Sequence, residues 1–338
     1  MLSPAPAPSL NFGRWPIAFL PLTRLVHSVF EVATLALLIC LLILSLLSVS
    51  FILYLRIKSR FASQLQNLSC HWSVRFLLVS FISLWSINEC FRLPFFRRRY
   101  IYPFLPPLSL SQQINFCKLN IILSLGLLQP GFLVSLLFLL NISINTRSPK
   151  ILSAIVFVAL ICLPICVLLY LSLHYLPERL TLPPIFHRSS FLLDDDLGHE
   201  IVICKYPLSS AIIFGAFVGV YAIVFLLACW KVLSLAINKR IRARINALTA
   251  TVMICLSVQI GLLSVSVLWN PDEILFYIFV FAVFVSVVVC AAVGESILVI
   301  RPISDALSVG TCRKGTTASY GTGRVSNGVS GCGLGVLR

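Results

Sequence analysis

Charged side chains are scarce in this sequence. Asp, Glu, Lys and Arg together make up 11% of the 338 residues, whereas a soluble domain usually carries about 25%. Hydrophobic residues make up 59%, and the mean hydropathy is +1.00. This balance excludes an ordinary soluble protein and predicts an all-α polytopic membrane protein.

Recognised catalytic motifs are missing as well. The sequence has no His-Glu-x-x-His zinc site, no Gly-x-Ser-x-Gly nucleophile elbow, no P-loop and no paired cysteine motifs at metal-ligand spacing. The acidic stretch from Asp194 to Glu200 lacks the ligand spacing of a calcium loop, so a solvated loop is expected there. We therefore predict a protein that is not an enzyme and that uses no cofactor and no metal.

Two further absences concern membrane architecture and targeting. Segments of about ten residues with alternating polarity, which an outer-membrane barrel requires, do not occur. The proline-rich segment from Met1 to His27 lacks the positively charged start and the short apolar core of a cleavable signal peptide. The first apolar segment is therefore expected to act as its own insertion signal.

Long apolar runs dominate what is present. About 20 apolar residues cross the roughly 30 Å hydrocarbon layer as a helix, because a helix satisfies its backbone hydrogen bonds internally. Around a bundle domain of residues 30–300, we expect a disordered tail at residues 1–29 and a short interfacial helix with a disordered tail at residues 301–338. The bundle is predicted to contain seven transmembrane helices, at about residues 32–55, 74–91, 119–140, 151–173, 208–230, 247–269 and 274–300.

The second predicted span contains Arg75 and Glu89, so the distribution of basic residues is needed to test it. With seven spans and an outer N-terminus, 16 of the 26 Lys and Arg residues fall on the cytoplasmic side. Without this span the two sides divide almost evenly. The positive-inside rule therefore predicts seven spans, an N-terminus outside and a cytoplasmic C-terminus, with the run Arg97–Arg99 as an exception on the outer side.

The net charge of +15 is concentrated on the predicted cytoplasmic face. Anionic lipids of the inner leaflet attract each nearby basic residue by about 1 kcal/mol. The lipid bilayer therefore accounts for the charge, and no nucleic-acid partner is expected. The predicted location is the plasma membrane or an endomembrane.

Most of the 12 cysteines lie in apolar spans, where cysteine behaves as a small hydrophobic residue. Cys117 and Cys204 are both placed near the outer face, where a disulfide would clamp the long loop before the fifth span to the bundle. Two unpaired thiols, or a pairing with Cys90, are the alternatives, because connectivity cannot be read from sequence. Cys312, beside two basic residues, is a candidate for palmitoylation, with an ordinary tail thiol as the alternative.

Polar side chains inside the spans are the strongest functional candidates, because each is costly in hydrocarbon unless it is paired or hydrated. Glu89 and Arg92 have the spacing of a same-face ion pair in the second span. Asn88 precedes them, and Glu295 lies in the seventh span. These residues either line a ligand pocket or proton path, or join helices through hydrogen bonds worth about 0.6–2 kcal/mol each.

Several segments together resemble a known family. They are Trp85–Glu89 with Arg92–Pro94, Gly126–Phe132, Ile237–Ile245, Ala291–Glu295 and Arg301–Ile303. These segments are similar to those of a plant family of seven-transmembrane proteins sometimes described as candidate G-protein-coupled-receptor-like proteins, and the resemblance covers about residues 30–310. It implies a seven-helix fold and a receptor-like role, without an assigned activity.

The sequence departs from rhodopsin-type receptors at three places. No Asp-Arg-Tyr ends the third span, no Cys-Trp-x-Pro lies in the sixth, and no Asn-Pro-x-x-Tyr closes the seventh. Coupling to G proteins by the rhodopsin-type mechanism is therefore not expected.

Two functional hypotheses remain open. In the first, the protein is receptor-like, its outer loop shapes a ligand site, and an intracellular signalling partner contacts the basic residues Lys239, Arg240, Arg242 and Arg244. In the second, it is a small-solute transporter or channel lined by Glu89, Glu295 and helices bent at Pro130 and Pro164. The sequence shows no convincing internal repeat, which transporters often have, so the receptor-like hypothesis is favoured.

Overall fold

The described part of the chain contains seven helices that are long and apolar enough to cross a membrane. The computed structural model describes residues 20–61, 72–96, 109–144, 151–175, 183–186, 188–194, 200–235, 238–269 and 273–301. By length and composition, its candidate spans are Ser28–Tyr54, Trp72–Arg92, Leu110–Ile142, Leu152–His174, Leu208–Leu235, Lys239–Ser266 and Ile274–Ile300. The prediction of seven apolar helices is confirmed, including the second, and the protein is a multi-pass integral membrane protein.

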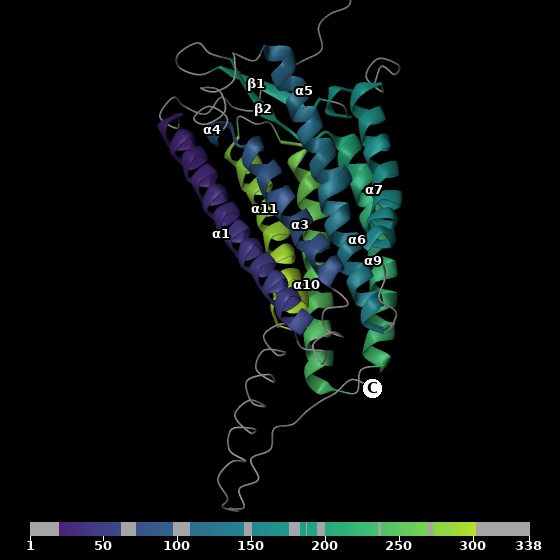
Figure 1. The fold of residues 1–338 in the computed structure, drawn as a ribbon. Coiled ribbons are helices and arrows are strands. Elements are labelled where there is room, and N and C mark those ends of the chain that lie inside the picture. The colour runs from purple at the N-terminus through teal and green to yellow at the C-terminus, as the bar shows by residue number, and fades with distance from the viewer. Residues whose placement is uncertain are drawn as a thin grey trace, which may run out of the picture.

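Twelve helical segments and two strands make up this part of the structure. In chain order they are α1 (Leu20–Phe61), α3 (Trp72–Arg92), α4 (Pro94–Phe96), α5 (Leu110–Ile121), the π-helix η4 (Ile122–Leu128), α6 (Gln129–Ile144), α7 (Ile151–His174), the 3-10 turn η5 (Pro184–Phe186), β1 (Ser190–Asp194), β2 (Glu200–Cys204), α9 (Leu208–Leu235), α10 (Lys239–Ser266), α11 (Ile274–Glu295) and the π-helix η6 (Ser296–Ile300). The two strands lie at one end of the bundle, which we call the hairpin end, and α10 begins at the opposite end (Figure 1).

The third span, built from α5, η4 and α6, lies at the centre of the bundle. Its most apolar window is 78% buried, whereas the corresponding windows of the first and fourth spans are 28% buried. Helix α1 packs against α3 and α11 on one flank, and α7 packs against η4 and α6 on another (Figure 1). Side chains of the third span therefore meet partners from most of the other helices.

A π-helix interrupts the third span directly before Pro130. Proline has no backbone N–H, so it cannot donate to the carbonyl of Gly126, four residues earlier, and its ring crowds that carbonyl. The chain meets this constraint by widening the preceding turns into η4 (Ile122–Leu128). Segments of this kind are frequent at functional sites, and η4 carries Ser124, which belongs to the site described below.

The long loop before the fifth span contains a β-hairpin that the sequence analysis missed. Strands β1 and β2 pair antiparallel, with Ser190 opposite Cys204 and Asp194 opposite Glu200. Cys204 at the end of β2 is joined to Cys117 of α5 by a disulfide, with 5.3 Å between the Cα atoms. The predicted pairing of Cys117 with Cys204 is therefore present, and the alternatives of two unpaired thiols or a pairing with Cys90 are not. Cys90 is a buried free thiol.

Three helices begin earlier in the chain than predicted. Helix α1 begins at Leu20, inside the predicted tail of residues 1–29, because Pro21 falls in the first turn, where proline is tolerated. Helix α5 begins at Leu110 with a Ser109 and Gln112 capping box, so Cys117 lies within a helix and does not open it. Helix α10 begins at Lys239. Of the predicted C-terminal region 301–338, only Arg301 belongs to the described residues.

Large apolar side chains cover the outside of the bundle. Leu160, Trp230 and Leu268 each have more than 70% of their surface exposed, and many other Leu, Ile and Val residues are exposed on the same helices. Soluble proteins rarely expose a continuous apolar surface of this extent. The helices are therefore apolar on both their inner and outer faces, as expected of helices surrounded by lipid.

Candidate functional site

Glu89 is the centre of a buried polar cluster near the hairpin end. It lies one turn before the end of α3 and has 5% of its surface exposed. Arg92 Nη1 donates to Glu89 Oε2 over 3.4 Å, and Ser124 Oγ donates to Oε1 over 2.8 Å. The predicted ion pair between Glu89 and Arg92 is thus present, and both carboxylate oxygens have partners.

Arg92 connects this cluster to the loop between β2 and α9. Its guanidinium donates to the hydroxyl of Tyr206 and lies 4.1 Å from the centre of the Tyr206 ring. Burial raises the pKa of Tyr206, so the phenol stays neutral at physiological pH. Arg92 is therefore held by a carboxylate, a hydroxyl and an aromatic face, an arrangement that compensates a cation partly removed from water.

From Ser124 the polar chain continues inward to α10. The indole Nε1 of Trp85 and the amide Nε2 of Gln129 both donate to Ser124 Oγ, over 3.2 and 3.4 Å. Gln259 Nε2 of α10 then donates to Gln129 Oε1 over 2.6 Å. The chain Arg92–Glu89–Ser124–Gln129–Gln259 therefore links α3, the third span and α10 through the core.

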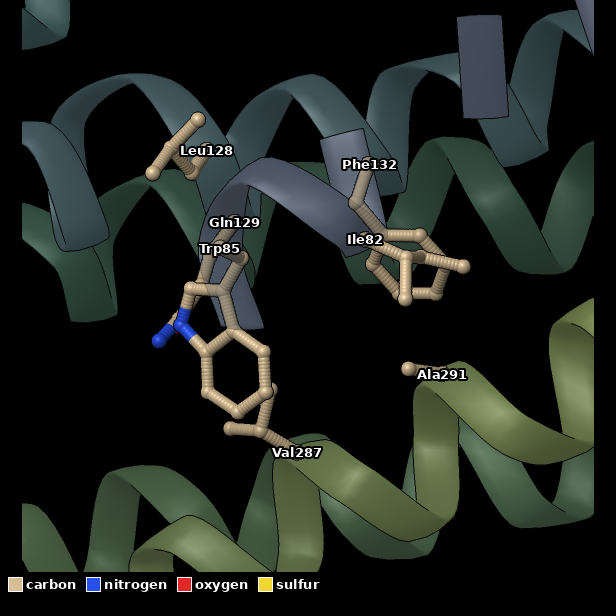
Figure 2. A pocket seen from close by; sticks show the side chains of 7 residues that line it. All are labelled: Ile82, Trp85, Leu128, Gln129, Phe132, Val287 and Ala291. Carbon is tan, nitrogen blue, oxygen red and sulfur yellow. The ribbon is translucent and has the colours of Figure 1, made fainter. Parts of the chain in front are cut away.

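A small apolar cavity lies beside the middle of this polar chain. Figure 2 shows Trp85 and Gln129 next to each other on one side of it, with Phe132 across from them and Val287 and Ala291 contributed by α11. The ring of Trp85 also stacks on Phe284 of α11, with 5.8 Å between the centroids.

Asn88 serves a different purpose from Glu89. Its side-chain amide donates to the backbone carbonyl of Asn120 over 3.3 Å, and the Asn120 amide donates back to the carbonyl of Asn88 over 2.8 Å. Both residues are buried. This reciprocal pair of hydrogen bonds joins α3 to α5. Asn88 therefore joins helices, which was one of its two predicted roles.

A larger pocket opens beside the Glu89 cluster at the hairpin end. It has about 700 Å³ of open space, including its mouth, and lies between α1, α3, β2 and α11. Its polar lining comes from Glu31, Glu89 and Arg92, and its apolar lining is mainly aromatic: Phe30, Phe276, Tyr277, Phe281 and Phe284. This pocket combines carboxylates and aromatic rings and is the part of the described structure best suited to hold a ligand.

The hairpin and its disulfide border the pocket. Ile203 and Cys204 of β2 line it, and the disulfide to Cys117 ties that strand to α5. After the strand, Lys205 donates to the backbone carbonyl of Trp269 over 2.7 Å, which fixes the loop to the end of the sixth span. Burial, and to a smaller degree the neighbouring Arg188, lowers the pKa of Lys205. The disulfide and the Lys205 hydrogen bond therefore fix strand β2 and the loop after it beside the pocket.

Glu295 does not join Glu89 in one site. The stacked rings of Trp85 and Phe284 lie at one level of the bundle, and the positions of both glutamates along the bundle axis can be counted from that level. Glu89 lies four residues toward the hairpin end along α3, and Glu295 lies eleven residues toward the opposite end along α11. At 1.5 Å per residue the two carboxylates lie about 20 Å apart along the bundle axis, so they do not line a common pocket.

The predicted basic contact lies in the first turns of α10 and not in a loop. Asn238 caps the helix by accepting from the backbone N–H of Arg240 over 3.0 Å. Lys239, Arg240 and Arg242 are exposed, Arg244 is half-buried, and no acidic residue lies in this first turn. These four cations lie at the opposite end from the pocket. Cys312 lies outside the described residues.

Sequence reasoning missed three members of the polar chain and also Tyr206, which accepts from Arg92. Ser124, Gln129, Tyr206 and Gln259 are polar groups from segments far apart in the sequence, and their common location depends on how the helices pack. One signal was available for two of them. An amide inside an apolar span is costly unless it is paired, so Gln129 and Gln259 could have been predicted as partners.

One family matches most of the chain. The sequence matches the family described as Uncharacterised conserved protein UCP031277 over residues 20–316, which include all seven spans, the polar chain, the pocket and the disulfide. No curated protein matches it. The chain belongs to this conserved family.

Proposed function

We propose that this protein is a receptor-like membrane protein that binds a small organic cation in the pocket at the hairpin end. The observation that carries the proposal is the position of Glu89. It lines the pocket, and it is also part of the buried polar chain that reaches Gln259 of α10. A ligand that contacts Glu89 would thus act directly on a connection between helices.

The lining of the pocket defines the chemistry of the ligand. Glu31, Glu89 and Arg92 line the pocket, and Arg92 is engaged by Glu89 and Tyr206. Aromatic faces attract cations, by about 2 kcal/mol when water is excluded. An amine with an apolar body fits this combination.

The connection to α10 supports a signalling role. Any cation that takes over a Glu89 oxygen weakens the bond from Arg92 or Ser124, and Ser124 is bonded in turn to Gln129. A ligand shifts a conformational equilibrium when it binds one arrangement more tightly than another. Helix α10 carries the basic segment Lys239–Arg244 at its other end. In the orientation predicted by the basic residues, the pocket faces outward and this segment faces a cytoplasmic partner.

The proposal is tested by thermal unfolding of the purified full chain in lipid nanodiscs. The probes are a panel of small aromatic and aliphatic amines, each paired with its neutral isosteric alcohol. We expect at least one amine, but not its alcohol, to raise the melting temperature. The effect should be lost in Glu89→Gln and in Val280→Trp, which fills the pocket, and kept in Val220→Trp, a change at a lipid-facing position with 66% exposure.

Two results would contradict the proposal. One is that no amine in the panel stabilises the protein. The other is that an amine stabilises Glu89→Gln and Val280→Trp as strongly as the unchanged protein, because binding would then take place elsewhere.

A small-solute transporter is the second candidate, and the buried Glu295 is the observation that favours it. The separation of Glu295 from Glu89 weighs against a shared path through the bundle. Solute flux into reconstituted vesicles that falls in Glu295→Gln would favour the transporter over the receptor. The resemblance to plant seven-transmembrane proteins remains a prediction and agrees with the receptor-like proposal.

A further inference from the structure

Glu295 is a completely buried carboxylate with one weak partner. None of its surface is exposed, although it lies in the seventh span. Ser45 Oγ of α1 donates to its Oε2 over 3.3 Å, and Oε1 has no hydrogen-bond partner in the described structure. No basic side chain of the described residues forms an ion pair with Glu295. An isolated buried carboxylate is strongly unfavourable, so this group is neutralised either by a proton or by a bound cation.

Two serines of α1 face this carboxylate in an unusual way. Most serines of the spans donate to a carbonyl of their own helix, as Ser50 does to Leu46 and Ser135 does to Gly131. Ser45 instead donates across to Glu295, and the hydroxyl of Ser48 lies close to the same carboxylate without a hydrogen bond of full geometry. Ser45 and Ser48 are 1% and 0% exposed and share one face of α1, three residues apart.

The group that these oxygens suit can be derived from their number and charge. One carboxylate and two hydroxyls are three hard oxygen ligands with a single negative charge. Calcium requires six to eight oxygens and usually several carboxylates, and magnesium is bound through carboxylates with near-ideal octahedral geometry. A proton on Oε1, shared with the Ser48 oxygen, would also neutralise the carboxylate, and the response to pH in the test below distinguishes it from a bound ion. A monovalent hard cation matches both the charge and the oxygen ligands.

We infer that Glu295, Ser45 and Ser48 form a sodium site between α1 and α11. Helix α1 packs against α11 and η6 at this level, so the ligands come from two spans that the ion would hold together. The site lies six residues, or about 9 Å along a helix, before Arg301, the last residue that the structure describes. It lies toward the end opposite the pocket, and it does not depend on the proposed amine site.

The test is a sodium titration of the purified full chain in nanodiscs, followed by the intrinsic fluorescence of its tryptophans during heating. Choline replaces sodium at constant ionic strength, and potassium is titrated in parallel. The melting temperature should rise by several degrees with sodium in a saturable way, and much less with potassium. Glu295→Gln should abolish the rise, and Ser48→Ala should increase the half-saturating sodium concentration severalfold.

Ser50→Ala is the matched control, because the Ser50 hydroxyl is bonded to its own helix over 2.9 Å. This variant should keep the full response to sodium. If Glu295→Gln does not fold, Ser48→Ala and binding of radioactive sodium decide the question. A melting temperature that does not depend on sodium would overturn the inference. So would equal sodium responses in the unchanged protein, Glu295→Gln and Ser48→Ala, or a response to pH alone that Glu295→Gln removes.

Discussion

At the scale of single residues, the Glu89–Arg92 ion pair is costly to bury, and both residues also line the pocket. Removing one member of a buried pair leaves an uncompensated charge and costs about 3–5 kcal/mol, whereas removing both members costs far less. We expect Arg92→Met to lower the melting temperature strongly, because Glu89 keeps only Ser124 as a partner. The double variant Glu89→Gln, Arg92→Met should recover most of the loss.

Thermal unfolding of the two variants in the same nanodiscs measures this difference. If the double variant melts as low as Arg92→Met, the stability of this region depends on Arg92 and Tyr206 and not on compensation of the Glu89 charge. The comparison requires no ligand.

Close packing at Gly131 gives a second prediction at the residue scale. A Cβ atom there would lie 2.5 Å from Cε1 of Phe81, whereas a Cβ at Gly219 would have no atom within 4 Å. Overpacking of this kind typically costs about 1–3 kcal/mol. Gly131→Val should therefore lower the melting temperature, and Gly219→Val should leave it nearly unchanged.

A matched rescue separates overpacking from other effects of the new side chain. Phe81→Leu combined with Gly131→Val should melt higher than Gly131→Val alone, because the smaller side chain relieves the clash and still fills most of the space. No rescue, or equal effects of the two glycine variants, would contradict this account of the α3 and α6 contact.

At the scale of elements, the hairpin is held to the bundle by the Cys117–Cys204 disulfide. Disulfides that close long loops typically contribute about 2–4 kcal/mol, and this one joins residues 87 positions apart. We expect Cys204→Ser to lower the melting temperature and to remove its dependence on reductant. Cys90→Ser, which removes a buried free thiol, should keep the reductant dependence. Equal reductant dependence in all three proteins would show that the bond does not stabilise the hairpin.

The start of α10 is a second element with a testable charge effect. Cations at a helix N-terminus oppose the helix dipole, by about 0.3–1 kcal/mol each at low salt, and anionic lipids offset this repulsion. Neutralising Lys239, Arg240 and Arg242 to Gln should therefore raise the melting temperature in zwitterionic nanodiscs. In nanodiscs rich in phosphatidylserine the gain should vanish or reverse. The same gain in both lipids would exclude a role for the anionic leaflet.

The elements also show which features a sequence can and cannot predict. The apolar runs predicted all seven helices, because about 20 apolar residues have few alternatives to a membrane helix. The polar turns that extend these helices, such as Leu110–Lys118 and Lys239–Arg244, carry no such signal. The π-helix before Pro130 was expected only as a bend. The hairpin was missed because the apolar residues 191–193 and 201–203 are too few to stand out in a chain this apolar.

At the scale of the whole molecule, the site was predictable only in part. The cost of burying charge in a membrane span singles out Glu89, Arg92 and Glu295 on their positions in the sequence alone. That cost does not determine which residues meet, because packing sets the distances between helices. The structure separates Glu295 from Glu89 and gives each its own partners, Ser45 for Glu295 and Ser124 for Glu89.

The pocket and the basic start of α10 are expected to lie on opposite sides of one membrane. The most direct measurement is thiol labelling in sealed microsomes, whose outer surface is cytosolic, with a reagent that does not cross membranes. Arg188→Cys reports on the hairpin end and Lys239→Cys on the start of α10; both positions are exposed, and labelling is compared with the unchanged protein. Lys239→Cys should be labelled at once, and Arg188→Cys only after permeabilisation. Labelling of both before permeabilisation, or the reverse order, would contradict it.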